Sequence, residues 1–297
     1  MLIKNILESK FVSVIIPVYN DTYRLKKCLE ALEKQTYSSS FFEIIVVDNG
    51  SKDNIEETVR KYNVKLLLEH NIQSSYAARN KGIRNCKGDI IAFIDSDCTP
   101  VPNWIEEGVK VLENEKVDLA GGKVNFTYST KKKAAEIFDS ITNMQIEENI
   151  RDRGVAKTAN LFISRNIIKE VGLFPENIKS GGDVFWTKKA TEQGFKLIYV
   201  PEAEVYHPTR NLKQLINKQI RVGKGQMSLW INDSVSCREI INRIFKGCMP
   251  PRIKLINKAI NERGMENMSS KLFSVWLVGW ISKLSTNYGR LKYFRRD

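Results

Sequence analysis

The chain has 297 residues, of which 42% are hydrophobic and 27% charged, a composition that excludes collagen-like, low-complexity and globally disordered proteins. Its five cysteines are scattered without a Cys-x-x-Cys pair, so we expect neither a disulfide framework nor a zinc site, and a reducing, cytoplasmic compartment fits best. The formal net charge of +13 lies in residues 208–297, because residues 1–207 balance to zero. We therefore expect chemistry in the first part and attraction to an anionic partner in the last.

Strand-like and helix-like segments alternate through the first 124 residues. The first ten residues are interrupted by charges, so we expect no export signal there. Amphipathic spacing and capping residues predict helices after Asn20 and over 53–62, 74–84 and 102–113. Continuous apolar runs predict strands at 12–18, 42–47, 64–68, 90–94 and 117–124. Such strands separated by helices predict an α/β fold with a mostly parallel central sheet and flanking helices.

The pattern changes after residue 125. A polar stretch precedes a predicted helix over 134–151, which is followed by a strand at 158–163. A helix at 183–193 and strands at 196–200 and 205–207 come next. We place a soft boundary near residue 210, which separates an α/β domain (1–210) from a helical, basic C-terminal region (211–297).

The C-terminal region contains one apolar run, residues 272–281, flanked by Lys271 and Lys283. The run is too short to span a bilayer, which takes about 20 residues. Its two tryptophans beside basic residues suit a helix in the plane of an anionic membrane surface, formed by 271–297. The alternative is a core helix packed on the catalytic domain, with solvated lysines around it. Nucleic acid is the partner we expect least, because no recognition motif is present.

Polar and acidic residues follow three of the predicted strands, in Tyr19-Asn20-Asp21, Asp48-Asn49-Gly50 and Asp95-Ser96-Asp97. Ligands of parallel α/β sheets bind beyond the carboxyl ends of the strands, so these residues are the first candidates for a site. Carboxylates two residues apart at a strand end suit Mg²⁺ or Mn²⁺. An isolated Asp-x-Asp is also common in solvated loops.

Four segments occur in order in the first hundred residues: Ile15 to Asn20, Val46 to Asp53, Ala78 to Gly82 and Phe93 to Asp97. With later pieces around Gly172, Ser180 and Tyr199, they make residues 12–225 resemble the family 2 glycosyltransferases, which have the GT-A nucleotide-diphospho-sugar transferase fold. The resemblance implies transfer of a sugar from a nucleotide-diphosphate donor, usually UDP-linked, to a hydroxyl of a glycan or lipid-linked acceptor. It also implies an Mn²⁺ or Mg²⁺ cofactor, and we expect a single displacement that inverts the anomeric centre.

The resemblance also assigns donor and metal residues. Asp48 matches the acid that receives the nucleobase, with Pro17, Tyr19 and Asn20 lining the same slot, although Asp48-Asn49-Gly50 also suits a plain turn. The Arg79-Asn80 pair matches residues near the nucleotide or donor sugar, or is a helix-surface pair. The metal residues implied are Asp97, with Asp95 near the ribose or the metal, and His207, which is otherwise a structural histidine.

Asp183 is the candidate general base that takes the proton of the acceptor hydroxyl. The chain departs from the commoner Glu-Asp form here, because Gly182 precedes the acid, and Asp183 could equally be a helix N-cap. Trp186 and Trp104 are candidate acceptor contacts, with core packing as the alternative for Trp104. Arg221 is placed to fold over the donor diphosphate, or lies on a solvated basic helix.

Two other functions fit parts of the pattern. A nucleotidyltransferase also uses a parallel sheet and an acid-bound metal, but it would want a Gly-rich basic loop where Pro17 to Asn20 stand. A catalytically silent nucleotide-sugar-binding protein would not need Asp95, Asp97 and Asp183 together. We expect a cytoplasmic enzyme of cell-envelope polysaccharide assembly, peripheral on the inner face of the plasma membrane.

Overall fold

A computed structural model describes residues 10–114 and 116–293 of the chain. The chain divides into two compact units that interleave along the sequence. The first comprises Met1–Asn125, Ile146–Asn177 and Gly182–His207, and the second comprises Phe126–Gln145, Ile178–Gly181 and Pro208–Asp297. We expect a single boundary near residue 210, with one continuous segment of chain on each side. That division into two domains stays a prediction.

The first unit is built on a mixed sheet. Within the described residues the sheet has eight strands in the order β3-β2-β1-β4-β7-β6-β8-β5. β1 pairs in parallel with β2 and β4, and β2 in parallel with β3, whereas β7 is antiparallel to β4 and β6. The bounds are β1 Val12–Val18, β2 Phe42–Asp48, β3 Lys65–Leu68, β4 Ile90–Ile94, β5 Thr99–Pro100, β6 Leu119–Thr127, β7 Asn160–Ser164 and β8 Leu197–Pro208.

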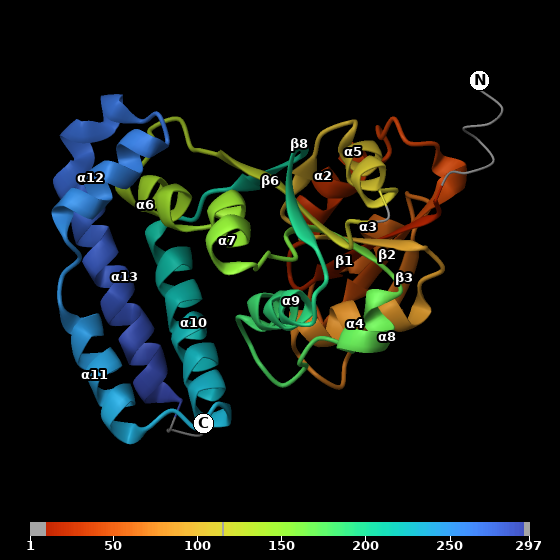
Figure 1. The fold of residues 1–297 in the computed structure, drawn as a ribbon. Helices are drawn as coiled ribbons and strands as arrows, with labels where there is room; N and C mark the ends of the chain where they lie inside the picture. The colour runs from red at the N-terminus through yellow and green to blue at the C-terminus, as the bar shows by residue number, and fades with distance from the viewer. Residues whose placement is uncertain (1–9, 115, 294–297) are drawn as a thin grey trace. The chain divides into compact units, whose positions relative to one another are not determined.

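Helices cover both faces of this sheet (Figure 1). α2, α3 and α5 lie on one side and α4, α8 and α9 on the other, as right-handed crossovers require when the strand order reverses beside β1. β1 and β4 are therefore buried along their whole length. The helices are α2 Thr22–Leu32, η1 Ser39–Phe41, α3 Ile55–Val59, α4 Ser75–Asn85, α5 Trp104–Leu112, α7 Ile146–Arg153, α8 Ile167–Val171 and α9 Gly182–Glu192.

Three expectations about these elements are wrong. The sheet is mixed rather than mostly parallel, because the apolar run of β7 reports burial on both faces and says nothing about direction. The helix expected over 134–151 is two helices, broken where Met144 adopts a left-handed φ of 51°. The two strands expected at 196–200 and 205–207 are one strand, β8, which continues through the exposed Pro201.

The second unit is helical. It consists of α6 Ala134–Thr142, α10 Leu212–Asn232, α11 Cys237–Cys248, α12 Ile253–Glu262, η2 Glu266–Lys271 and α13 Leu272–Lys292. α10, α11 and α12 lie along α13 (Figure 1). Glycines bring α10 and α13 close, because a Cβ on Gly223 would lie 2.0 Å from the carbonyl oxygen of Thr286.

The apolar run at 272–281 forms the first half of α13. Val275 and Val278 pack with residues of α6 and α12 in one core cluster, so this face of the helix is packed within the second unit. The indole N–H groups of Trp276 and Trp280 donate to the carbonyl oxygens of Pro251 and Cys248, at 2.7 and 2.9 Å. Across residues 10–114 and 116–293, no helix has the length and apolarity needed to cross a membrane.

Candidate active site

The loops that follow β1 and β2 are joined by hydrogen bonds. The backbone N–H of Lys52 donates to Oδ1 of Asn20 at 2.7 Å, and the N–H of Asn20 donates to Oγ of Ser51 at 2.9 Å. Pro17 is buried in β1, whereas Tyr19 is exposed. Of the expected slot residues, Asn20 therefore lies on a connected pair of loops, whereas Pro17 lies inside β1.

Asp48 ends β2 and is nearly buried. Its Oδ1 accepts the N–H of Ser51 at 3.0 Å, so the turn expected here is real and also holds the carboxylate. Asn49, which we did not single out, donates through Nδ2 to the carbonyl oxygens of Glu69 and Ile72, at 3.0 and 2.9 Å. These bonds tie the loop after β2 to the loop that leads into α4.

Arg79 and Asn80 lie in α4, and both are buried, which contradicts the helix-surface alternative. The Arg79 guanidinium donates to Oδ1 of Asp95 and forms an ion pair with it. Asn80 instead brackets the backbone of Phe174, accepting its N–H at 2.9 Å and donating to its carbonyl oxygen at 2.8 Å. Arg79 therefore pairs with an acidic residue of the turn after β4, and Asn80 holds the backbone at Phe174.

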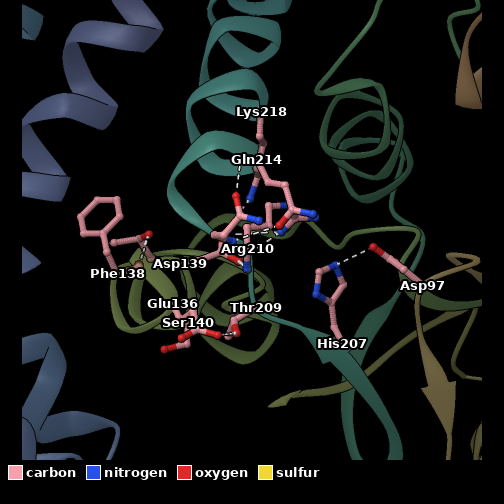
Figure 2. A network of polar contacts seen from close by, with 12 residues as sticks. Asp97, Glu136, Phe138, Asp139, Ser140, His207, Thr209, Arg210, Gln214 and Lys218 are labelled. Atoms are coloured by element: carbon pink, nitrogen blue, oxygen red, sulfur yellow. Dashed lines mark hydrogen bonds and ion pairs between the residues drawn. The ribbon is translucent and has the colours of Figure 1, made fainter. Parts of the chain in front are cut away.

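Asp95 and Asp97 lie in the turn after β4. Burial raises the pKa of the Asp95 carboxyl, and the negative charge of Asp97 adds to the shift, while Arg79 opposes it. Oδ2 of Asp97 lies 3.5 Å from Nε2 of His207, which is buried near the end of β8 (Figure 2). The structure thus places Asp97 beside His207, two of the three residues expected to hold a metal, whereas Asp95 pairs with Arg79.

The donor set fits a divalent cation. Ligands about 2.1 Å from an octahedral ion stand about 3 Å apart, close to the separation of Asp97 Oδ2 and His207 Nε2. A carboxylate and an imidazole are ligands that a divalent cation such as Mn²⁺ accepts. Within the described part of the chain, no group of three or more His, Cys, Asp and Glu side chains is compact enough to hold an ion by itself.

Asp183 lies in the first turn of α9, which begins at Gly182, so the N-cap alternative is wrong by two positions. Its Oδ1 accepts the N–H of Val184 at 3.0 Å and the hydroxyl of Tyr76 at 3.2 Å. The negative charge of Asp183 also contributes to the raised pKa of Asp95, so the two carboxylates face the same region. We did not single out Tyr76 in the sequence, where it is one more residue at the start of an amphipathic helix.

Both tryptophans expected to touch the acceptor are buried in the core. Trp104 is 0% exposed and donates through Nε1 to Oδ1 of Asn160 at 2.8 Å. Trp186 is 1% exposed and donates to the carbonyl oxygen of Gly172 at 2.8 Å. Neither ring is presented to solvent, so the structure supports a packing role and we do not carry the acceptor role further. Arg221 lies on α10, in the other unit, and its role at the diphosphate stays a prediction.

A sheet of this topology, with acidic side chains at the carboxyl ends of parallel strands, defines a glycosyltransferase domain with a GT-A-like fold. The sequence model of glycosyl transferase family 2 matches residues 13–161. The chain belongs to this family, and the nucleotidyltransferase and silent binding-protein alternatives are set aside.

The chain is also similar to individual proteins. Glycosyltransferase AglE of Haloferax volcanii is 42% identical over 295 residues, which are 97% of each chain. Chondroitin synthase of Escherichia coli is 31% identical over 195 residues, 60% of this chain and 28% of that protein. The mannosyltransferase PcManGT from Pyrobaculum calidifontis, solved with GDP-Man and Mn²⁺, shares the fold, with a TM-score of 0.64 at 16% identity over 96% of this chain and 87% of that one.

Proposed function

We propose that this chain is an inverting glycosyltransferase that moves a sugar from a UDP-linked donor to a hydroxyl of a glycan or lipid-linked acceptor in cell-envelope polysaccharide assembly, with Asp183 as general base. One observation carries the proposal. Asp183, Tyr76, Arg79, Asp95 and the Asp97–His207 pair form a continuous set of side chains within one unit. In this set, Asp95 and Asp97 lie near the candidate cation site, and Asp183 lies apart from them. Such an arrangement suits displacement of a diphosphate leaving group, because the cation stabilises the leaving group and the separate acid takes a proton.

The donor nucleotide is recognised by Asp48. A carboxylate accepts N–H groups, and uracil presents one N–H between two carbonyls, while guanine presents an N–H and an amino group on one edge. The N–H of Ser51 already donates to Oδ1 of Asp48. We therefore expect the carboxylate to accept one N–H from the base, which favours uracil. The GDP-Man bound to the Pyrobaculum enzyme makes guanine the alternative base that the assay below must include.

The cation would be held by Asp97 and His207, with Asp95 beside them, and would neutralise charge on the departing diphosphate. Arg79 holds Asp95 in place through its guanidinium. Asp183 takes the proton of the acceptor hydroxyl while the acceptor oxygen bonds to the anomeric carbon and the bond from that carbon to the diphosphate oxygen breaks. Attack from the face opposite the leaving group inverts the anomeric centre.

A panel of nucleotide sugars identifies the donor through Mn²⁺-dependent thermal stabilisation followed by a transfer assay. We expect UDP-sugars to give the largest shift, and a larger shift with GDP-sugars would overturn the uracil assignment alone. Asp183→Asn should lower kcat by about 10² to 10⁴, the usual contribution of a general base. Asp152→Asn, at an exposed ion pair, is the matched control and should leave kcat unchanged. Full activity of Asp183→Asn would refute the proposed mechanism.

We also propose that the second unit binds the cytoplasmic face of an anionic membrane. α13 has an exposed stripe opposite its packed face, and α11 exposes Ile241 and Phe245 one turn apart. The exposed apolar residues of α13 in this stripe are Phe273, Leu277, Leu284, Tyr288 and Leu291. Exposed cations of the same unit lie on α11, on α12 and at the residue before α12, at Arg238, Lys246, Arg252, Lys254 and Lys258. Apolar side chains beside cations suit an anionic lipid surface.

Flotation with lipid vesicles tests this surface. We expect the whole chain to float with phosphatidylcholine vesicles that contain phosphatidylglycerol and to remain unbound with phosphatidylcholine alone. The double variant Phe273→Ser, Leu277→Ser should lose flotation, while Tyr23→Ser, which removes an exposed ring from the other unit, should keep it. Equal flotation of both variants would refute the lipid role of α13.

A further inference from the structure

Tyr76 connects the candidate base to the rest of the site. Its hydroxyl donates to Oδ1 of Asp183 at 3.2 Å, across 107 positions of sequence. Its ring is buried, stacks on Phe174 with centroids 6.2 Å apart, and has the Arg79 guanidinium carbon 5.8 Å from its centroid. The hydroxyl is thus held by packing on the ring and directed at a carboxylate.

Gly182 leaves the space that this ring occupies. A Cβ at position 182 would lie 2.9 Å from both Cε2 and Cζ of Tyr76, closer than van der Waals contact allows. Any side chain at position 182 would therefore displace the ring and its hydroxyl. The glycine that departs from the usual acidic pair at this point and the tyrosine are two parts of one arrangement.

The two oxygens of Asp183 differ in their surroundings. Among the described residues, the hydrogen bonds that the Asp183 side chain accepts both end on Oδ1, from Val184 N–H and from Tyr76 O–H. Oδ2 is left to receive a proton. A carboxylate whose one oxygen is fixed by two donors can turn very little about its own axis, so the direction of Oδ2 is fixed too.

We propose that Tyr76 is a positioning residue for the general base: its hydroxyl fixes Oδ1 of Asp183 and thereby aims Oδ2 at the acceptor hydroxyl. The inference rests on the proposed function of Asp183. In the reaction, the acceptor proton passes to Oδ2, the acceptor oxygen bonds to the anomeric carbon, and the nucleoside diphosphate leaves with the electron pair of the broken bond.

The charges around Asp183 set the sign of the test. The titratable groups that face it are Tyr76 from α4 and Asp95 from the turn after β4, and Arg79 faces both of these. Burial raises the pKa of Tyr76, and the neighbouring Asp183 charge raises it further, so the hydroxyl keeps its proton and remains a donor. Donation from this hydroxyl stabilises the charged form of the carboxylate that accepts it.

Tyr76→Phe is the direct test, because it keeps the ring and removes only the hydroxyl. We expect the acidic limb of the kcat profile to move to higher pH by about 0.5 to 1 unit, since the charged carboxylate loses one of two donors. The KM for the donor should stay unchanged, because the ring still packs beside Arg79. Tyr37→Phe is the matched control: its hydroxyl donates to the carbonyl oxygen of Lys10 at 2.6 Å, and its removal should leave the limb in place.

A fluorinated tyrosine placed at position 76 should shift the acidic limb of the kcat profile in the opposite direction. It keeps the ring packing and is a stronger donor, so the acidic limb should move to lower pH, and this variant serves even where Tyr76→Phe does not fold. An unchanged limb with the fluorinated residue, or with a folded Tyr76→Phe, overturns this inference while Asp183→Asn remains inactive. Full activity of Asp183→Asn overturns the proposed function itself.

Discussion

Asn160 joins three elements of the first unit through one buried side chain. It lies on β7 and is fully buried. Its Nδ2 donates to the carbonyl oxygens of Lys123 on β6 and Ala203 on β8, at 2.9 and 2.8 Å, and its Oδ1 accepts the indole N–H of Trp104 on α5. Gly122 allows this approach, because a Cβ there would lie 2.4 Å from Nδ2. Asn160→Ala removes all of these hydrogen bonds at once.

The expected loss can be worked from the partners that remain. One indole N–H and two carbonyl groups stay buried without Asn160, and each such group costs about 1 to 3 kcal/mol. Water can enter the vacated space, so the lower part of each range applies and the sum is about 4 kcal/mol. Trp104→Phe removes the indole bond and part of a buried ring, and should cost about 2 to 3 kcal/mol. Against a typical domain stability of about 5 to 15 kcal/mol, Asn160→Ala should approach the limit of folding.

Urea unfolding followed by intrinsic fluorescence measures both variants. Asn63→Ala, at an exposed turn of the same unit, is the control and should stay within about 0.5 kcal/mol of the wild type. If Asn160→Ala were within 1 kcal/mol of the wild type, or no worse than Trp104→Phe, the hydrogen-bond account of this core would be refuted.

The remaining predictions concern metal, packing and pH. His207→Ala should raise the Mn²⁺ concentration for half-maximal activity by at least about tenfold, measured by metal titration, and an unchanged titration would exclude it as a ligand. Trp186→Phe should lower the free energy of unfolding by about 1 to 2 kcal/mol through loss of its buried N–H bond, with no change in acceptor KM; a raised KM would restore an acceptor role. In the second unit, burial works to raise the pKa of Glu136, but hydrogen bonds from Ser129, Lys133 and Thr209 outweigh it and hold the pKa below the model-peptide value of 4.5. Its stabilising effect is therefore full above pH 4.5 and disappears as pH falls through the lower folded value, so the stability deficit of Glu136→Gln in thermal unfolding should shrink at acid pH and not at neutral pH.

The strands of the first hundred residues, and the polar residues at their ends, could be predicted from the sequence because both depend on burial. A strand covered on both faces must be apolar along its length, and its polar successors must lie at the edge of the sheet. Asp48 and Asp95 are such polar residues, and the structure places Asp48 at the end of β2 and Asp95 directly after β4. The direction of β7 could not be predicted, because an antiparallel strand buried on both faces has the same composition as a parallel one.

The missed parts of the site depend on partners that are distant in sequence. Asn49 bonds carbonyl groups 20 and 23 positions away, and Tyr76 bonds a carboxylate 107 positions away. Local periodicity contains no information on such pairs. The sequence feature that points to this pair is Gly182, which departs from the commoner Glu-Asp form. The structure supplies the cause, because the space beside Gly182 holds the Tyr76 ring.

The C-terminal apolar run shows why one segment supported two interpretations. A helix with a single apolar stripe either packs or faces lipid, whereas α13 has two stripes. Val275, Val278 and Gly279 pack on neighbouring helices, while Phe273 and Leu277 stay exposed. The composition of the run could not separate these faces, because a run that is apolar on all sides reads the same whatever covers it. Packing now accounts for one stripe, and the exposed stripe among the cations of a strongly basic unit is what the flotation experiment isolates.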